Sequence, residues 1–196
     1  MSDLDKLISI KYNNIKPAQG KILLSEPFLR DYYFKRSVVL LADHSAEGSF
    51  GLIINKPIEV RFSEVIKDFP DFKAPIYLGG PVKTDSLFFI HTLGDKIENS
   101  TAIMDGLFWG GDIDTVKEMI TLHQITANEI RFFIGYSGWD SKQLDKELEV
   151  NSWVVTKVRK SDILNTNPLT MWSDFVKKLG KNYAYWVNFP VDPAIN

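Results

Sequence analysis

The strongest constraint on this chain is an unbroken run of branched apolar residues, Val38, Val39, Leu40 and Leu41. Side chains alternate between the two faces of a β-strand, so a strand that lacks a polar face must be covered on both sides. Residues 37–42 are therefore predicted to form a strand inside a sheet. Helices must flank that sheet, which places the chain in a mixed α/β class.

Further elements are predicted from apolar runs, helical spacing and turn residues. Strands are expected where short apolar runs lie between turn signals, at residues 21–25, 50–55, 76–78, 87–93, 130–136, 153–158 and 183–189. Helices are expected where apolar residues recur at helical spacing or capping residues frame a segment, at residues 3–10, 62–69, 112–124, 141–150 and 169–179. The chain shows no linker, low-complexity segment or strict repeat, so residues 1–196 are predicted to form one domain.

Composition limits the classes of function. The longest apolar runs are far shorter than the ~20 residues of a membrane helix, so we expect no membrane span. Acidic residues in the first positions, where a secretory signal is basic, predict a cytoplasmic protein. The absence of cysteine removes disulfides, thiolate metal ligands and cysteine nucleophiles. A net charge of -2 gives no general attraction for nucleic acid.

The segment Gly135-Tyr136-Ser137-Gly138-Trp139 follows a predicted strand and precedes a predicted helix. A hydrolase places its nucleophilic serine at such a position. That motif needs a small residue where this chain has Trp139, so we predict a structural corner closed by a buried indole ring. The alternative is a hydrolase-like enzyme, in which Asp43, His44, His91 or Ser137 would have to meet in one pocket.

Polar residues and glycines at predicted strand ends form the candidate binding surface, which comprises His44, Asn55, Gly79, Gly80 and His91. Glycine lets a ligand approach the backbone, and polar residues at strand ends are where mixed folds place sites. The alternative is that Asn55 and His44 only hydrogen-bond loop backbone. The three histidines are too widely spaced for a metal signature, so neither a metal nor a cofactor is predicted.

A group of basic residues lies near the C-terminus and comprises Lys157, Arg159, Lys160, Lys177, Lys178 and Lys181. A solvated surface is the simpler interpretation of such a group. Direct nucleic-acid binding through these residues is the third hypothesis. The sequence offers no helix-turn-helix pair with a basic second helix, so direct contact with DNA is not expected.

Several motifs in one order resemble the AlgH/YqgE family of bacterial proteins. They are residues 20–24 with Pro27, residues 34–41 with His44, Gly51-Leu52-Ile53-Ile54-Asn55-Lys56-Pro57, Leu78-Gly79-Gly80-Pro81-Val82, His91, residues 135–139, residues 143–147 and residues 151–153. The resemblance spans about residues 20–180. Ser137 stands where the family usually has alanine, which argues further against a serine nucleophile.

The resemblance implies both a fold and a role. It implies an α+β fold, with a bent mixed β-sheet partly closed into a small barrel and surrounded by helices. Members of the family are labelled transcriptional regulators. We therefore expect a cytosolic binding module for a small molecule or a protein, with a regulatory role that need not involve DNA contact, rather than an enzyme.

Overall fold

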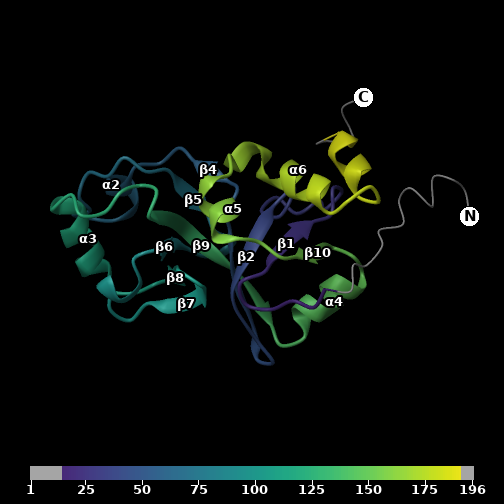
Figure 1. The fold of residues 1–196 in the computed structure, drawn as a ribbon, viewed down its shortest axis with the longest axis horizontal. Helices are drawn as coiled ribbons and strands as arrows, with labels where there is room; N and C mark the ends of the chain where they lie inside the picture. Colours follow the sequence, from purple (N-terminus) through teal and green to yellow (C-terminus); the bar gives the residue numbers. More distant parts are fainter. Residues whose placement is uncertain (1–14, 191–196) are drawn as a thin grey trace, which may run out of the picture.

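The computed structural model describes residues 15–190, and the helix expected at residues 3–10 lies outside them. Ten strands form one largely antiparallel sheet (Figure 1). Its main path follows β10 (Trp153–Thr156), β1 (Ile22–Ser25), β2 (Val38–Ser45), β3 (Gly48–Ile53), β9 (Ile130–Asp140), β6 (Val82–His91), β8 (Leu107–Trp109) and β7 (Thr101–Met104). Off this path, β4 (Pro57–Ile58) pairs with β5 (Ile76–Leu78), which runs parallel to β9.

Helices cover the sheet from several sides (Figure 1). The described α-helices are α2 (Phe62–Val65), α3 (Ile113–Thr121), α4 (Gln143–Glu149), α5 (Lys160–Asn165) and α6 (Pro168–Lys178). Two 3₁₀ helices are η1 (Gly94–Lys96) and η2 (Ala184–Asn188). The mixed α+β class predicted from the sequence is therefore confirmed.

Strand β2 is covered on both faces, as its apolar run predicts. Val38 and Leu40 belong to one buried cluster, which also contains Trp172 and Val176 of α6. Val39 and Leu41 belong to a second cluster, together with Leu144 and Leu148 of α4 and both Trp139 and Trp153. The prediction that helices flank this strand is confirmed.

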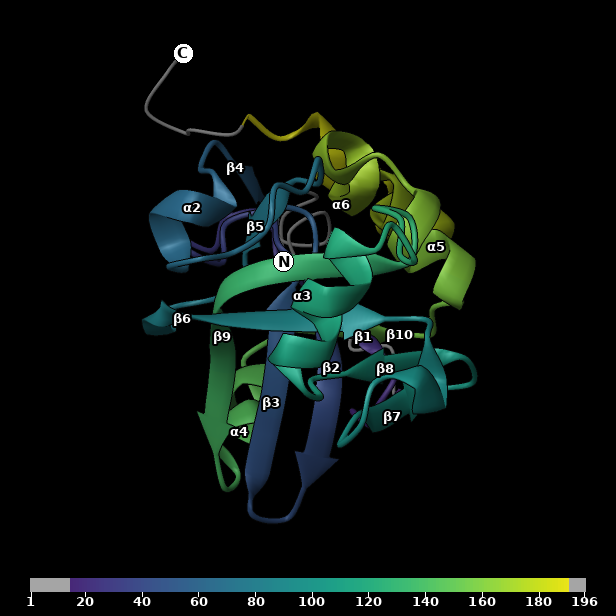
Figure 2. The same cartoon turned by 90° about the vertical axis from the view of Figure 1, so that its left-hand side faces the viewer.

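The sheet does not close into the small barrel that the resemblance implied. Closure requires the end strands to pair, but within residues 15–190 β10 pairs only with β1, and β7 only with β8. The reason lies in β9, which bends (Figure 2). Its first half pairs with β6 and β5 and its second half mainly with β3. The sheet is therefore spread over separate buried clusters instead of enclosing one.

The segment 135–139 lies inside β9 and is not a turn between a strand and a helix. Only Gly135 has a positive φ, of 68°, and it stands where β9 changes its pairing partners. The predicted corner is thus a bend within one strand. Trp139 is 5% exposed, and the prediction that its ring is a buried plug is confirmed.

Some predicted boundaries and types are wrong. The strand predicted at residues 183–189 is instead the 3₁₀ helix η2 (Ala184–Asn188), because Tyr183 and Trp186 turn together into the core instead of alternating across a sheet. Helix α2 ends at Val65, and Ile66 is already extended. Strands β4, β7 and β8 and helix α5 were not predicted, since two to six residues carry too little periodicity to be recognised.

Candidate functional site

The most developed polar site lies at the end of the β2–β3 hairpin. Gly48 begins β3, and a Cβ there would lie 2.5 Å from the carbonyl oxygen of Trp139, so only glycine lets β9 approach this closely. The hydroxyl of Ser141 donates a hydrogen bond of 2.8 Å to the carbonyl oxygen of Ala46. The hairpin loop is therefore tied to the connection between β9 and α4.

The register of these strands separates two faces. Asp43 pairs with Phe50, whereas His44 pairs with Ser49. Directly paired residues of antiparallel strands share a face, and neighbouring residues point to opposite faces. The hairpin therefore presents His44 and Ser49 on the side of α4, and Asp43 and Phe50 on the other side.

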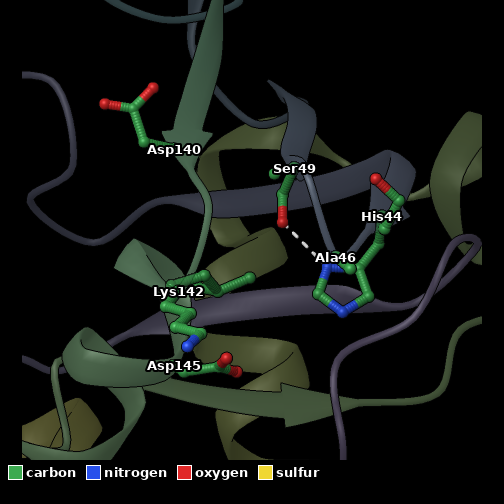
Figure 3. A pocket seen from close by; sticks show the side chains of 9 residues that line it. His44, Ala46, Ser49, Asp140, Lys142 and Asp145 are labelled. Atoms are coloured by element: carbon green, nitrogen blue, oxygen red, sulfur yellow. Dashed lines mark hydrogen bonds between the residues drawn. The ribbon is translucent and has the colours of Figure 1, made fainter.

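On the α4 side lies a pocket of about 370 Å³ (Figure 3). Its lining includes His44, Ser49, Asp140, Lys142 and Asp145. The Nδ1 of His44 and the Oγ of Ser49 are 2.8 Å apart, which fixes the ring and leaves Nε2 free to meet a ligand. An imidazole, a hydroxyl, an ammonium and two carboxylates can together bind a polar ligand that carries both donors and acceptors.

On the other face lies a second pocket of about 570 Å³. Its lining comprises Asp43, Ser45, Glu47, Gly48, Ser49, Phe50, Val82, Tyr136, Gly138, Trp139, Asp140 and Gln143. Aromatic rings and carboxylates dominate it. The two pockets share Ser45, Gly48, Ser49 and Asp140 but differ in chemistry.

His91 lies elsewhere and is fully buried. Its Nδ1 accepts a hydrogen bond from the backbone N–H of Leu93 at 3.3 Å, so the proton is on Nε2. Nε2 lies 3.1 Å from the carbonyl oxygen of Gly110 and 3.0 Å from the hydroxyl of Ser100, which itself donates to the carbonyl oxygen of Ile97. Burial lowers the pKa of His91. A neutral ring that donates from Nε2 cannot take a proton from Ser100.

Asn55, Gly79 and Gly80 have structural roles: the side chain of Asn55 hydrogen-bonds backbone groups, and the two glycines let backbone segments approach closely. The side-chain oxygen of Asn55 accepts from the N–H of Val38 at 2.8 Å, and its amide donates to the carbonyl oxygen of Arg36 at 3.0 Å. A Cβ at Gly79 would lie 2.1 Å from the carbonyl oxygen of Gly135, and a Cβ at Gly80 would lie 2.3 Å from that of Tyr136. Of the five residues of the predicted binding surface, only His44 lines the pocket beside α4.

The four residues of the enzyme alternative are not linked to one another as a catalytic group. The hydroxyl of Ser137 is fully buried and donates to the carbonyl oxygen of Gly79 at 3.0 Å. Asp43 accepts from the backbone N–H of His44 rather than from its ring. His91 is engaged at Gly110. Each side chain has its own structural partner.

Two further observations concern the described residues. Within residues 15–190, no three His, Cys, Asp or Glu side chains are grouped so that they could hold a metal ion. In the same part of the chain, no helix is both long and apolar enough to cross a membrane.

The C-terminal basic residues are partly neutralised. Arg159 and Lys178 both contact the carboxylate of Asp162, at 3.0 Å and 3.2 Å. The hydrogen bond from Arg159 is the main cause that lowers the pKa of Asp162 to about 2. Lys178 also lies over the ring of Phe175.

Ser49, Lys142 and Asp145, which complete the pocket around His44, were not predicted from the sequence. A hairpin signal was present, because Gly48 lies between two strand-length runs. It would have placed Ser49 beside His44. Nothing in the sequence indicates that α4 packs against this hairpin. Lys56, part of the predicted Asn55-Lys56-Pro57 loop, does not line the pocket: its ammonium donates to the carbonyl oxygen of Tyr33 at 2.6 Å, and burial lowers its pKa to about 8.

The fold is that of a mixed α+β protein built on an open, largely antiparallel sheet. The AlgH-like family profile matches residues 22–184. A UPF0301 protein of Bacteroides thetaiotaomicron is 46% identical over 191 residues, which cover 97% of each chain. A UPF0301 protein of Parabacteroides distasonis is 41% identical over 198 residues, which cover 100% of each chain.

Among solved structures, the solution structure of the AlgH protein from Pseudomonas aeruginosa is similar, with a TM-score of 0.72 at 25% identity. The similarity covers 92% of this chain and 98% of that one. The chain belongs to the AlgH-like family.

Proposed function

We propose that this protein is a cytoplasmic binding module for a polar small molecule or a protein segment, and that it acts in regulation without contacting DNA itself. The binding site is the pocket between the β2–β3 hairpin and α4. The observation that carries the proposal is the pair formed by His44 and Ser49 at the wall of this pocket.

The pocket has the features of a recognition site. Its volume of about 370 Å³ lies in the range of ligand sites. The hydrogen bond to Ser49 holds the imidazole in place before a ligand arrives, which lowers the entropy lost on binding. Lys142 stands at the N-cap of α4 with a left-handed backbone, at φ 61°, and Asp145 follows in the first turn. Charges of both signs therefore face the same cavity.

A thermal-shift screen of metabolites and lysate fractions tests the proposal. A ligand present at 100 times its Kd stabilises the folded state by about 2.7 kcal/mol, which raises the Tm of a chain of this size by roughly 5–10 °C. We expect one or more fractions to produce such a shift in the wild type, and the shift to be lost in His44→Asn.

His123→Asn is the matched control, because His123 is an exposed histidine with a left-handed backbone that asparagine tolerates. It should keep the shift. If every stabilising fraction acts equally on His44→Asn and on the wild type, the pocket beside α4 is not the site.

A further inference from the structure

We propose that the pocket on the other face of the hairpin binds a flexible organic cation with several ammonium or guanidinium groups. A free polyamine and a basic peptide segment carry this chemistry. The site lies on the opposite face of the hairpin from His44, and Phe50, Tyr136, Asp43 and Glu47 line only this pocket, so the proposal stands even if the pocket at His44 binds nothing.

The pocket is lined by two partly buried aromatic rings, Phe50 and Tyr136, whose centroids are 4.9 Å apart. Outside the lining, the ring of Phe50 packs on Trp109 at 4.6 Å and on Phe88 at 5.9 Å, which hold it in place. All four rings are only partly buried. An aromatic face attracts a cation held above it, and it also covers the methylene groups that carry the charge.

The hollow exists because Gly138 has no side chain. Gly138 pairs with Phe50, so a side chain at this position would stand on the aromatic face. A Cβ there would already lie 3.0 Å from the ring of Tyr136. Gly138 is exposed, which leaves the space above the rings open to a ligand.

The rim is uniformly acidic. Asp43, Glu47 and Asp140 line the pocket and are exposed, and its lining contains no lysine, arginine or histidine. Within residues 15–190, none of these three carboxylates has a cationic side chain within ion-pair distance. Unpaired charges of one sign around a hollow raise the local concentration of the opposite ion.

The spacing of the carboxylates selects the kind of cation. The described residues offer no group of three acidic or histidine side chains close enough to hold a metal ion. The negative charges are therefore spread around the rim. Separate cationic groups joined by apolar stems fit such a rim and floor together, which a metal ion does not.

Isothermal titration calorimetry with spermidine, and separately with a Gly-Arg-Lys-Arg-Gly peptide, tests the proposal. It should be done at about 0.15 M ionic strength, where long-range attraction between exposed charges is largely screened. We expect saturable binding of at least one probe, weakened about tenfold or more in Asp43→Asn/Glu47→Gln. Phe50→Leu, which keeps an apolar side chain but removes the π face, should weaken it several-fold.

Asp145→Asn is the matched control, since it removes one carboxylate from the opposite face of the hairpin. It should change the affinity less than about twofold, as should His44→Asn. Thermal unfolding verifies that each variant folds. If Phe50→Leu does not fold, the affinities of the carboxylate variants alone decide the outcome. Tighter binding of spermidine would identify the ligand as a free polyamine, and tighter binding of the peptide would identify it as a basic peptide segment. Binding of neither probe, or equal weakening by Asp145→Asn, would overturn the proposal.

Discussion

Two buried tryptophans depend on one carboxylate. The indole N–H groups of Trp139 and Trp153 donate to the same oxygen of Glu147, at 2.8 Å and 2.7 Å. Their rings also meet edge to face, at a centroid distance of 5.9 Å. This small network joins β9, β10 and α4 beneath the pocket of His44.

We therefore predict that Trp139→Ala lowers the free energy of unfolding by about 3–5 kcal/mol, because it leaves a large cavity in the core. Urea denaturation followed by circular dichroism measures the change. Leu122→Ala is the control: Leu122 is 55% exposed, and its loss should cost little. A loss below about 1 kcal/mol for Trp139→Ala would show that the ring is not part of the core.

His91 should make stability depend on pH. Its pKa is lowered by burial, so the unfolded chain, with an ordinary pKa near 6.5, binds the proton more readily. The contribution is fully present above about pH 6.5 and is lost as the pH falls through the folded-state pKa. The urea midpoint of the wild type should therefore be lower at about pH 5.5 than at about pH 7. In His91→Gln, this difference between the two midpoints should be smaller. An unchanged difference in His91→Gln would assign the pH dependence to other groups.

At the scale of elements, the close approach of β5 to the bend of β9 is the most demanding contact. Gly79 follows β5, its N–H donates to the carbonyl oxygen of Ile134, and no side chain fits between it and Gly135. Gly79→Ala should cost at least about 1–3 kcal/mol, because rigid backbone atoms must move. Gly138→Ala should cost less, because its Cβ would meet only side chains, those of Tyr136 at 3.0 Å and Val82 at 3.8 Å. If Gly138→Ala lowered the urea midpoint more than Gly79→Ala does, this explanation of the bend would be wrong.

Elements with a strong periodic signal were predictable from sequence. The apolar run of β2 specified both its type and its burial. Helix α3 is capped by Asp112, as its acidic start predicted, and α6 begins at Pro168, one residue before the predicted range. The η2 segment was predicted as a strand because a short aromatic run fits the period of a helix and that of a strand equally well. Its packing against α6 decides between helix and strand.

At the scale of the molecule, the candidate site was predictable only in part. His44 was identified because it ends a strand beside a turn. Asn55 and His91 were grouped with it on the same argument, but the fold places each beside its own backbone partners. Which loops meet depends on how β9 bends, and local sequence does not encode that bend beyond Gly135. The aromatic pocket draws residues from four strands, β2, β3, β6 and β9, so no single sequence motif predicts it.

The central claim is that the two faces at the end of the β2–β3 hairpin differ in chemistry, so that a flexible organic cation binds at the aromatic, acidic face and not at the face beside α4. An NMR titration of ¹⁵N-labelled protein with spermidine tests it most directly. The account predicts saturable shifts of the amide signals of Phe50, Tyr136 and Gly138, while those of Leu144 and Asp145 on the opposite face stay in place. Shifts spread equally over distant acidic residues such as Asp95, or no shifts with either spermidine or the basic peptide, would contradict it.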